Sequence, residues 1–293
     1  MIPVRPFNRE NALRYGAYYA ARLLPHPAIR QGVAAAVRTC ISVQQGRADA
    51  SEHAEAQAAL QALRQDGLAR LSSPLTAAQF DDVLAYLETV PAGTGPSAQP
   101  VTARTEGVAS AAYDLPTILA CPHLVAAMNH PCLLEIAAAF LGCKPTISGV
   151  GLRWSFPGGG GASDIQQFHR DMEDWKILRV FVYLTDVVEG CGPHQFVMGS
   201  HRTAGRFRLR PYSDGAVDAQ FGREKVVTIS GPRGTAFMAD MWGIHRGVPP
   251  TLKPRLLFSA TYTMTATSIY QYRPIEVQDG HLYDQYTNRL LIR

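Results

Sequence analysis

Gln167-Phe168-His169-Arg170-Asp171 is followed, after a short gap, by the apolar run Ile177-Leu178-Arg179-Val180-Phe181-Val182-Tyr183-Leu184. This run has the length and composition of a buried β-strand. In an extended chain, successive side chains alternate between two faces, so His169 and Asp171 can point to one side while Arg170 points to the other. The pattern predicts an imidazole and a carboxylate presented together beside a buried strand.

A histidine and an aspartate on one face can occupy two adjacent positions around a metal ion. A second histidine is available in Trp242-Gly243-Ile244-His245, and Lys253-Pro254-Arg255 follows it. Two histidines and one carboxylate with open positions opposite them are typical of non-haem Fe(II) oxygenases. An HxD pair alone is more often a solvated polar pair, so the hypothesis depends on the strand and the distal histidine.

Composition limits the classes of protein that the chain can represent. It has 293 residues, 46% hydrophobic and 18% charged, which allows one domain with a sizeable core. The net charge of +4 is too small to indicate nucleic-acid binding. We find no apolar run long enough for a membrane span and no secretory signal. Five cysteines without a CxxC motif favour reduced thiols, a cytoplasmic location and no cysteine-based zinc site.

The hydrophobic pattern changes along the chain. Residues 1–65 are helix-prone and are expected to form an N-terminal extension of a single compact unit that continues over 66–293. Thr76 and Gln79 predict a capping box, His130-Pro131 opens another helix, and 91–114 reads as a long loop. Further strands are expected near 150–156, 177–184, 225–229, 235–239 and 255–263. Helices followed by strands predict an α+β, mainly β fold, with helices packed on an antiparallel jelly roll.

The order of these motifs resembles one known family. Over about residues 66–263, the chain resembles the phytanoyl-CoA dioxygenase family of Fe(II)/2-oxoglutarate oxygenases. The resemblance lies in the order of motifs: HxD, a buried strand, the turn Glu189–Pro193, the triplet Gly199-Ser200-His201, a long insert, a distal histidine and then an arginine. Met198 stands where the family usually has proline before the Gly199-Ser200-His201 triplet. Cys191 stands where the family often has asparagine before Gly192, so the Glu189–Pro193 turn is expected to differ. The resemblance implies a double-stranded β-helix, that is, a cupin-like jelly-roll core.

The resemblance also implies a reaction and its cofactors. Fe(II) would be held by His169, Asp171 and His245, and 2-oxoglutarate would be converted to succinate and CO2 while O2 is used to hydroxylate a C–H bond. A planar guanidinium suits the far carboxylate of the cosubstrate, and Arg255 matches the family position. Ser259 shares its strand face, and Phe181 and Gln167 are further candidates for the cosubstrate pocket. His201 is expected to be structural.

Candidate substrate contacts rest on weaker patterns. Gly158–Gly161 and the insert after His201 would frame the mouth, and an anionic substrate would suit the insert's arginines. The alternative for those arginines is a solvated basic face, and core packing is the alternative for the tryptophans. The candidates are Trp154, Trp242, Arg206, Arg208 and Arg210.

Other functions remain open at this point. A cupin-like metal-binding protein or a non-oxygenase metalloenzyme could use the same three ligands with zinc or manganese. Arg255 discriminates between these readings, because it has an evident role only if 2-oxoglutarate binds. Asp171 disfavours halogenation, which in similar enzymes leaves the carboxylate position empty for halide. We expect a small organic substrate, such as a natural product, lipid or acyl derivative, and no nucleic-acid partner.

Overall fold

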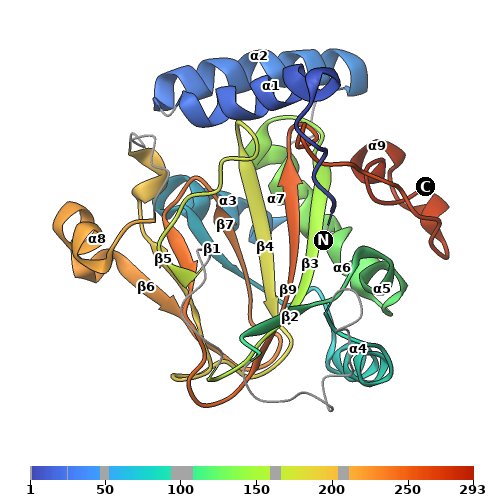
Figure 1. Cartoon of the computed structure of the whole chain (residues 1–293), viewed down its shortest axis with the longest axis vertical. Coiled ribbons are helices and arrows are strands. Elements are labelled where there is room, and N and C mark those ends of the chain that lie inside the picture. Colours follow the sequence, from blue (N-terminus) through green and yellow to red (C-terminus); the bar gives the residue numbers. More distant parts are fainter. Residues whose placement is uncertain (1, 25, 47–52, 94–107, 159–165, 204–210) are drawn as a thin grey trace.

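Two antiparallel sheets form the centre of the protein (Figure 1). The computed structural model describes residues 2–24, 26–46, 53–93, 108–158, 166–203 and 211–293. The larger sheet has the order β1-β7-β4-β9-β3-β2, and the smaller sheet has the order β6-β5-β8. The strands are β1 (Leu68–Leu71), β2 (Ser110–Ala112), β3 (Thr146–Ser155), β4 (Ile177–Tyr183), β5 (His194–Val197), β6 (Val226–Ile229), β7 (Ala236–Asp240), β8 (His245–Gly247) and β9 (Arg255–Thr263).

The two faces of the larger sheet carry different side chains. On β4, Leu178, Val180 and Val182 belong to the core cluster that also contains residues of the helices. The alternate residues Phe181 and Tyr183 face the smaller sheet and pack with residues of β5, β6 and β7. Burial of each large apolar side chain contributes about 1.5–3 kcal/mol, so this alternation fixes which face of β4 lies inside the barrel. The two antiparallel sheets, packed against each other through this inner face, confirm the expected double-stranded β-helix.

Helices cover the outer face of the larger sheet. The capping box of Thr76 and Gln79 starts α4, and Gly142 ends α7 in a left-handed conformation with φ of 77°. Loss of such an N-cap typically costs about 1 kcal/mol. The helices are α1 (Ala12–Leu23), α2 (Pro27–Gln45), α3 (Ala54–Asp66), α4 (Ala77–Thr89), α5 (Leu115–Ala120), α6 (Leu124–Met128), α7 (Pro131–Leu141), α8 (Asp214–Phe221) and α9 (Gln285–Asn288).

The N-terminal segment crosses one end of the larger sheet. In Figure 1, α1 and α2 lie over the end where β4 begins and β9 finishes. Val4 forms a β-bridge with Tyr270, and the guanidinium of Arg30 donates hydrogen bonds to the carbonyl oxygens of Asp174 (2.7 Å) and Trp175 (3.0 Å). The segment is thus fixed to the barrel at two places.

Two expectations need correction, and one helix was not predicted. Ser110–Ala112 lies in the predicted loop but pairs with β3 as an edge strand, and α8 forms within the insert after His201, for which no secondary structure was predicted. The segment Leu124–Leu141 is as long and apolar as a membrane-spanning helix by composition. It consists of α6 and α7 separated by Asn129 and His130, and residues of both helices are buried in the core, so it is a core segment.

Candidate metal centre

A short β-bridge brings the two candidate histidines together. The backbone N–H of His169 donates to the carbonyl oxygen of His245 at 3.0 Å, and the N–H of His245 donates to His169 at the same distance. Directly opposed residues of an antiparallel pair point to the same face. The imidazole centroids consequently lie 4.4 Å apart, although the residues are far apart in sequence.

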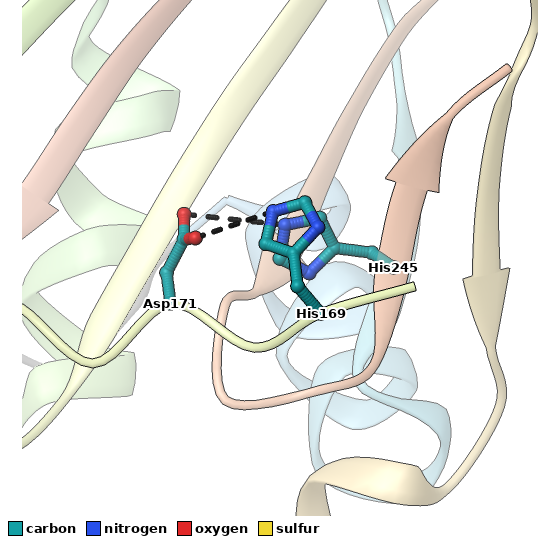
Figure 2. Close-up of side chains that lie close together, drawn as sticks. All are labelled: His169, Asp171 and His245. Carbon is teal, nitrogen blue, oxygen red and sulfur yellow. Dashed lines mark ion pairs between the residues drawn. The ribbon is translucent and has the colours of Figure 1, made fainter. Parts of the chain in front are cut away.

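Asp171 completes the cluster from the same extended segment. Its N–H donates to the carbonyl oxygen of Met241 at 2.9 Å, which fixes the chain beyond Arg170. Asp171 Oδ1 lies 3.5 Å from His169 Nε2, and Oδ2 lies 3.9 Å from His245 Nε2 (Figure 2). One candidate ligand atom from each of the three residues lies within 4.8 Å of the others.

Hydrogen bonds set the orientation of both imidazole rings. Nδ1 of His169 is 2.8 Å from the Gln167 carbonyl oxygen, and Nδ1 of His245 is 2.9 Å from the Gly243 carbonyl oxygen. A carbonyl oxygen only accepts, so each Nδ1 carries the proton and each Nε2 keeps a lone pair. Both lone pairs belong to the atoms that approach Asp171, as a metal site requires.

Electrostatics favour the cation-binding protonation states of His245 and Asp171, and His169 is the exception. Burial, followed by the neighbouring His169, lowers the pKa of His245 to about 3, so its imidazole is neutral at pH 7. Burial would raise the pKa of Asp171, but Arg179 and both histidines outweigh burial and hold it below its usual range. Burial also acts to lower the pKa of His169, and the Asp171 carboxylate raises it overall. A divalent cation would compensate the buried carboxylate, so the donor set fits Fe(II).

Arg179 is a site residue that the sequence analysis missed. Its Nη1 lies 2.9 Å from Asp171 Oδ2, and its Nε donates to Thr261 Oγ1 at 2.9 Å. It stands on the inner face of β4, two residues before Phe181. The available signal was a single cation within the otherwise apolar run 177–184.

The inner face of the barrel also holds two buried polar groups with unused hydrogen-bonding capacity. Arg255 donates to the Gly192 carbonyl oxygen and to Ser155 Oγ (3.4 Å), yet its Nε has no partner among the described residues. His194 Nε2 is likewise unpartnered within the described chain. The His194 ring lies 5.5 Å from the ring of His245 and 4.7 Å from that of Phe181. This donor set fits a small dicarboxylate that reaches from the metal centre towards Arg255.

The other predicted cosubstrate residues lie nearby in different ways. Phe181 is buried on the inner face and stacks on Phe237. Ser259 pairs with Phe181 across β4 and β9, and it lines a cavity. The side chain of Gln167 is exposed, and its carbonyl oxygen orients His169. The roles of these residues at a bound cosubstrate stay predictions.

A cavity of about 220 Å³ adjoins the metal centre through Arg179. Glu173 lines it, with Oε1 at 4.0 Å from Arg22 of α1 and a buried Oε2 that has no partner in the described chain. Burial, and then the charge of Asp171, raise the pKa of Glu173 to about 7. The remaining lining residues are mostly small or hydroxyl-bearing: Ile2, Ser148, Gly149, Val150, Gly151, Ser259, Thr261, Thr263, Thr267 and Tyr270.

The candidate substrate residues are not gathered at this cavity. Trp154 packs with the helix-facing core and donates from its indole nitrogen to Tyr113 Oη at 3.2 Å. Trp242 lines a second cavity, next to α2. Neither tryptophan is among the described residues that line the cavity beside Arg179, and the substrate roles of both stay predictions. Arg206, Arg208 and Arg210 lie outside the described residues, as do Gly159–Gly161.

His201 packs against the chain as a structural residue would. Its Nε2 lies 3.3 Å from the Arg64 carbonyl oxygen, and its ring covers Gly67, where an added Cβ would lie 2.5 Å from Nδ1. Gly67 has φ of 81° and ends α3.

All five cysteines are free.

Comparison with known families gives one match, to the phytanoyl-CoA dioxygenase (PhyH) model over residues 63–255, well over half of the chain. No curated protein matches significantly.

Solved structures share the fold. EctD from S. alaskensis with bound Fe superposes with a TM-score of 0.53 at 20% identity, over 84% of this chain and 88% of its own. The carbocyclase SnoK from nogalamycin biosynthesis gives 0.51 at 18% identity, over 79% and 93%. The epimerase SnoN from the same biosynthesis gives 0.50 at 20% identity, over 71% and 82%. At such identities the likeness establishes the fold and not the substrate.

Proposed function

The chain belongs to the phytanoyl-CoA dioxygenase family, and from this premise we propose that it hydroxylates an unactivated C–H bond of a small organic substrate, with release of succinate and CO2. The class of enzyme is that of the Fe(II)- and 2-oxoglutarate-dependent oxygenases. The observation that carries the proposal is the cluster of His169, Asp171 and His245, with both Nε2 atoms turned towards the carboxylate.

His169, Asp171 and His245 would hold the iron on one face. When bound, Fe(II) and 2-oxoglutarate together supply the activation of O2. The residues around them set the geometry. The Gln167 and Gly243 carbonyl oxygens fix the two rings, and Arg179 holds one oxygen of Asp171, which leaves the other oxygen for the metal.

Arg255 would bind the far carboxylate of 2-oxoglutarate. Its buried guanidinium lies at the start of β9, and an unpartnered Nε adds donor capacity. His194 Nε2 can donate to or accept from the same cosubstrate, depending on which ring nitrogen carries the proton. Phe181 would exclude water from the space between His194 and the inner face of β4.

The substrate would occupy the cavity beside Arg179. Its volume of about 220 Å³ and its hydroxyl-bearing walls favour a small polar group over a bulky apolar one. The buried Glu173 Oε2 would accept a hydrogen bond from a substrate hydroxyl or amine. Ile2 and Arg22 would close the cavity from the N-terminal side.

The test is anaerobic difference absorption on addition of Fe(II) and then 2-oxoglutarate. We expect a visible charge-transfer band with the wild type and its loss in Asp171→Ala. A protein that binds Fe(II) but gives no spectral change with 2-oxoglutarate would instead fit a cupin-like metal-binding protein. Succinate release can then be used to screen substrates.

A further inference from the structure

A second cavity, of about 660 Å³, lies between α2, the C-terminal ends of α3 and α7, and the loop before β4. Its size is that of pockets that hold a complete small ligand. The described residues that line it include none of His169, Asp171 and His245. It is therefore distinct from the metal centre and from the substrate cavity.

The lining of this cavity is strongly cationic. A single carboxylate, Asp240, faces five basic groups among the described lining residues, and burial raises the pKa of that carboxyl. The ends of α3 and α7 add roughly half a negative charge each. About two negative charges thus oppose five positive ones, so helix capping does not account for all the cations. The five cationic residues are Arg30, Arg38, Arg64, Lys176 and Arg202; His201 also lines the cavity, but burial lowers its pKa and it is not counted here.

These cations are crowded and only partly satisfied. Lys176 Nζ donates to the Phe140 carbonyl oxygen at 2.6 Å, and Arg30 is held by carbonyl oxygens. Burial lowers the pKa of Lys176, and Arg38 and Arg64 add to the reduction. In the described parts of the chain, Arg38, Arg64 and Arg202 form no ion pair with a carboxylate. Those three side chains are exposed and can reach a ligand, whereas Arg30 is buried and Lys176 half-buried, and a bound anion would offset the cost of holding these two charges away from water.

Apolar surface lines the same cavity. Leu63, Phe140 and Leu141 contribute to its wall together with two tryptophans. The Arg30 guanidinium lies 4.1 Å from the ring centroid of Trp242. An inorganic anion would leave this apolar wall in contact with water, whereas a ligand with both an anionic and an organic part would cover it.

We propose that the cavity binds a small organic phosphate, whose phosphate group contacts Arg38, Arg64 and Arg202 and whose organic part packs on the apolar wall. A phosphate ester carries up to about two negative charges and three acceptor oxygens, which matches the surplus of cations. Guanidinium groups bind such oxygens through paired hydrogen bonds. The site goes beyond the proposed oxygenase reaction, because it requires neither iron nor 2-oxoglutarate.

The experiment is calorimetric titration of the metal-free protein with pyrophosphate and with ADP at low ionic strength. The pocket variant combines Arg38→Glu and Arg64→Glu, and the control variant combines Arg223→Glu and Arg273→Glu. All four residues are exposed, so each pair should fold, and both pairs change the net charge equally. Circular dichroism checks folding, and Arg38→Gln with Arg64→Gln replaces the pocket pair if the reversal unfolds the protein.

We expect saturable binding to the wild type, tighter for ADP than for pyrophosphate. The pocket variant should bind about tenfold more weakly or worse, since it loses hydrogen bonds between charged groups. The control should stay close to the wild type. Equal weakening in both variants, or no saturable binding to the wild type, would overturn the proposal. If the protein does not bind ADP but sediments with phosphatidylglycerol vesicles, the proposal is also overturned, in favour of a lipid headgroup as the ligand.

Discussion

Replacement of Arg255 by leucine is expected to change the stability of the cosubstrate-free protein little. The Arg255 side chain is buried, and burial lowers its pKa, so the unpaired cation costs free energy of folding. Leucine removes that cost but leaves the Gly192 carbonyl oxygen without its donor, which costs about 1–3 kcal/mol. Because the two effects oppose each other, we expect a net change within about 2 kcal/mol in urea unfolding.

Binding of 2-oxoglutarate should respond very differently to the same substitution. Truncation of one partner of a buried charge pair costs about 2–5 kcal/mol, which corresponds to a roughly 30-fold to 4,000-fold rise in Kd. Anaerobic calorimetry with 2-oxoglutarate measures this directly, and titration with Fe(II) should show nearly unchanged metal affinity. Arg255→Lys should lie between wild type and leucine, because it keeps the charge but loses the planar fork.

Arg153 provides the sharpest control for this prediction. It pairs with Leu257 on the neighbouring strand, shares the inner face, and is a partly buried cation. Arg153→Leu should leave 2-oxoglutarate affinity far less affected than Arg255→Leu. If the order of the two affinities were reversed, Arg153 would be the clamp and the reasoning about Arg255 would be refuted.

Three further predictions concern the same centre. Alanine at any of the three candidate ligands (His169, Asp171, His245) should abolish turnover with the circular dichroism spectrum kept; 2-oxoglutarate decarboxylation in all three variants would contradict the metal assignment. His194→Phe keeps a ring but loses Nε2, so calorimetry should show 2-oxoglutarate binding weaker by about 1.5–3 kcal/mol with Fe(II) affinity kept; equal cosubstrate affinity would argue against contact. Arg179→Met removes the cation that most lowers the pKa of Asp171, so the pKa of Asp171 should rise. On acidification, the variant should therefore lose Fe(II) at a higher pH than the wild type. If Fe(II) binding measured against pH has the same midpoint in both proteins, Arg179 does not have this role.

Local patterns were sufficient for much of the fold. The capping box at Thr76 depends only on Gln79, three residues further on, and β9 begins and ends where the apolar alternation does. The HxD pair shares a face because alternation in an extended segment is also local. The pairing of His169 with His245 is not local, and its prediction depended on the order of motifs along the chain.

The site residues that were missed depend on register between distant strands. Arg179 meets Asp171 only because β4 places it opposite Thr261, and His194 meets His245 across β5 and β8. Trp154 shows a different limit of local patterns. A strand was expected near 150–156, but alternation along a strand does not say which of its faces lies inside the barrel. On β3, the large apolar residues lie on the face that the helices cover. The small and cationic residues lie on the inner face of the barrel: Gly149, Gly151 and Arg153.

The cavity beside the metal centre is built partly from residues outside the family match. Residues 63–255 contain the candidate ligands, Arg255 and His194, and hence the parts that would handle iron and 2-oxoglutarate. Half of the residues that line the adjoining cavity lie outside this range: Ile2 precedes it, and Ser259, Thr261, Thr263, Thr267 and Tyr270 follow it. The bridge between Val4 and Tyr270 joins these two outer segments to each other over the end of the sheet. In this chain, therefore, segments on both sides of the matched range contribute walls to the cavity beside the metal centre, whereas the candidate ligands all lie within that range.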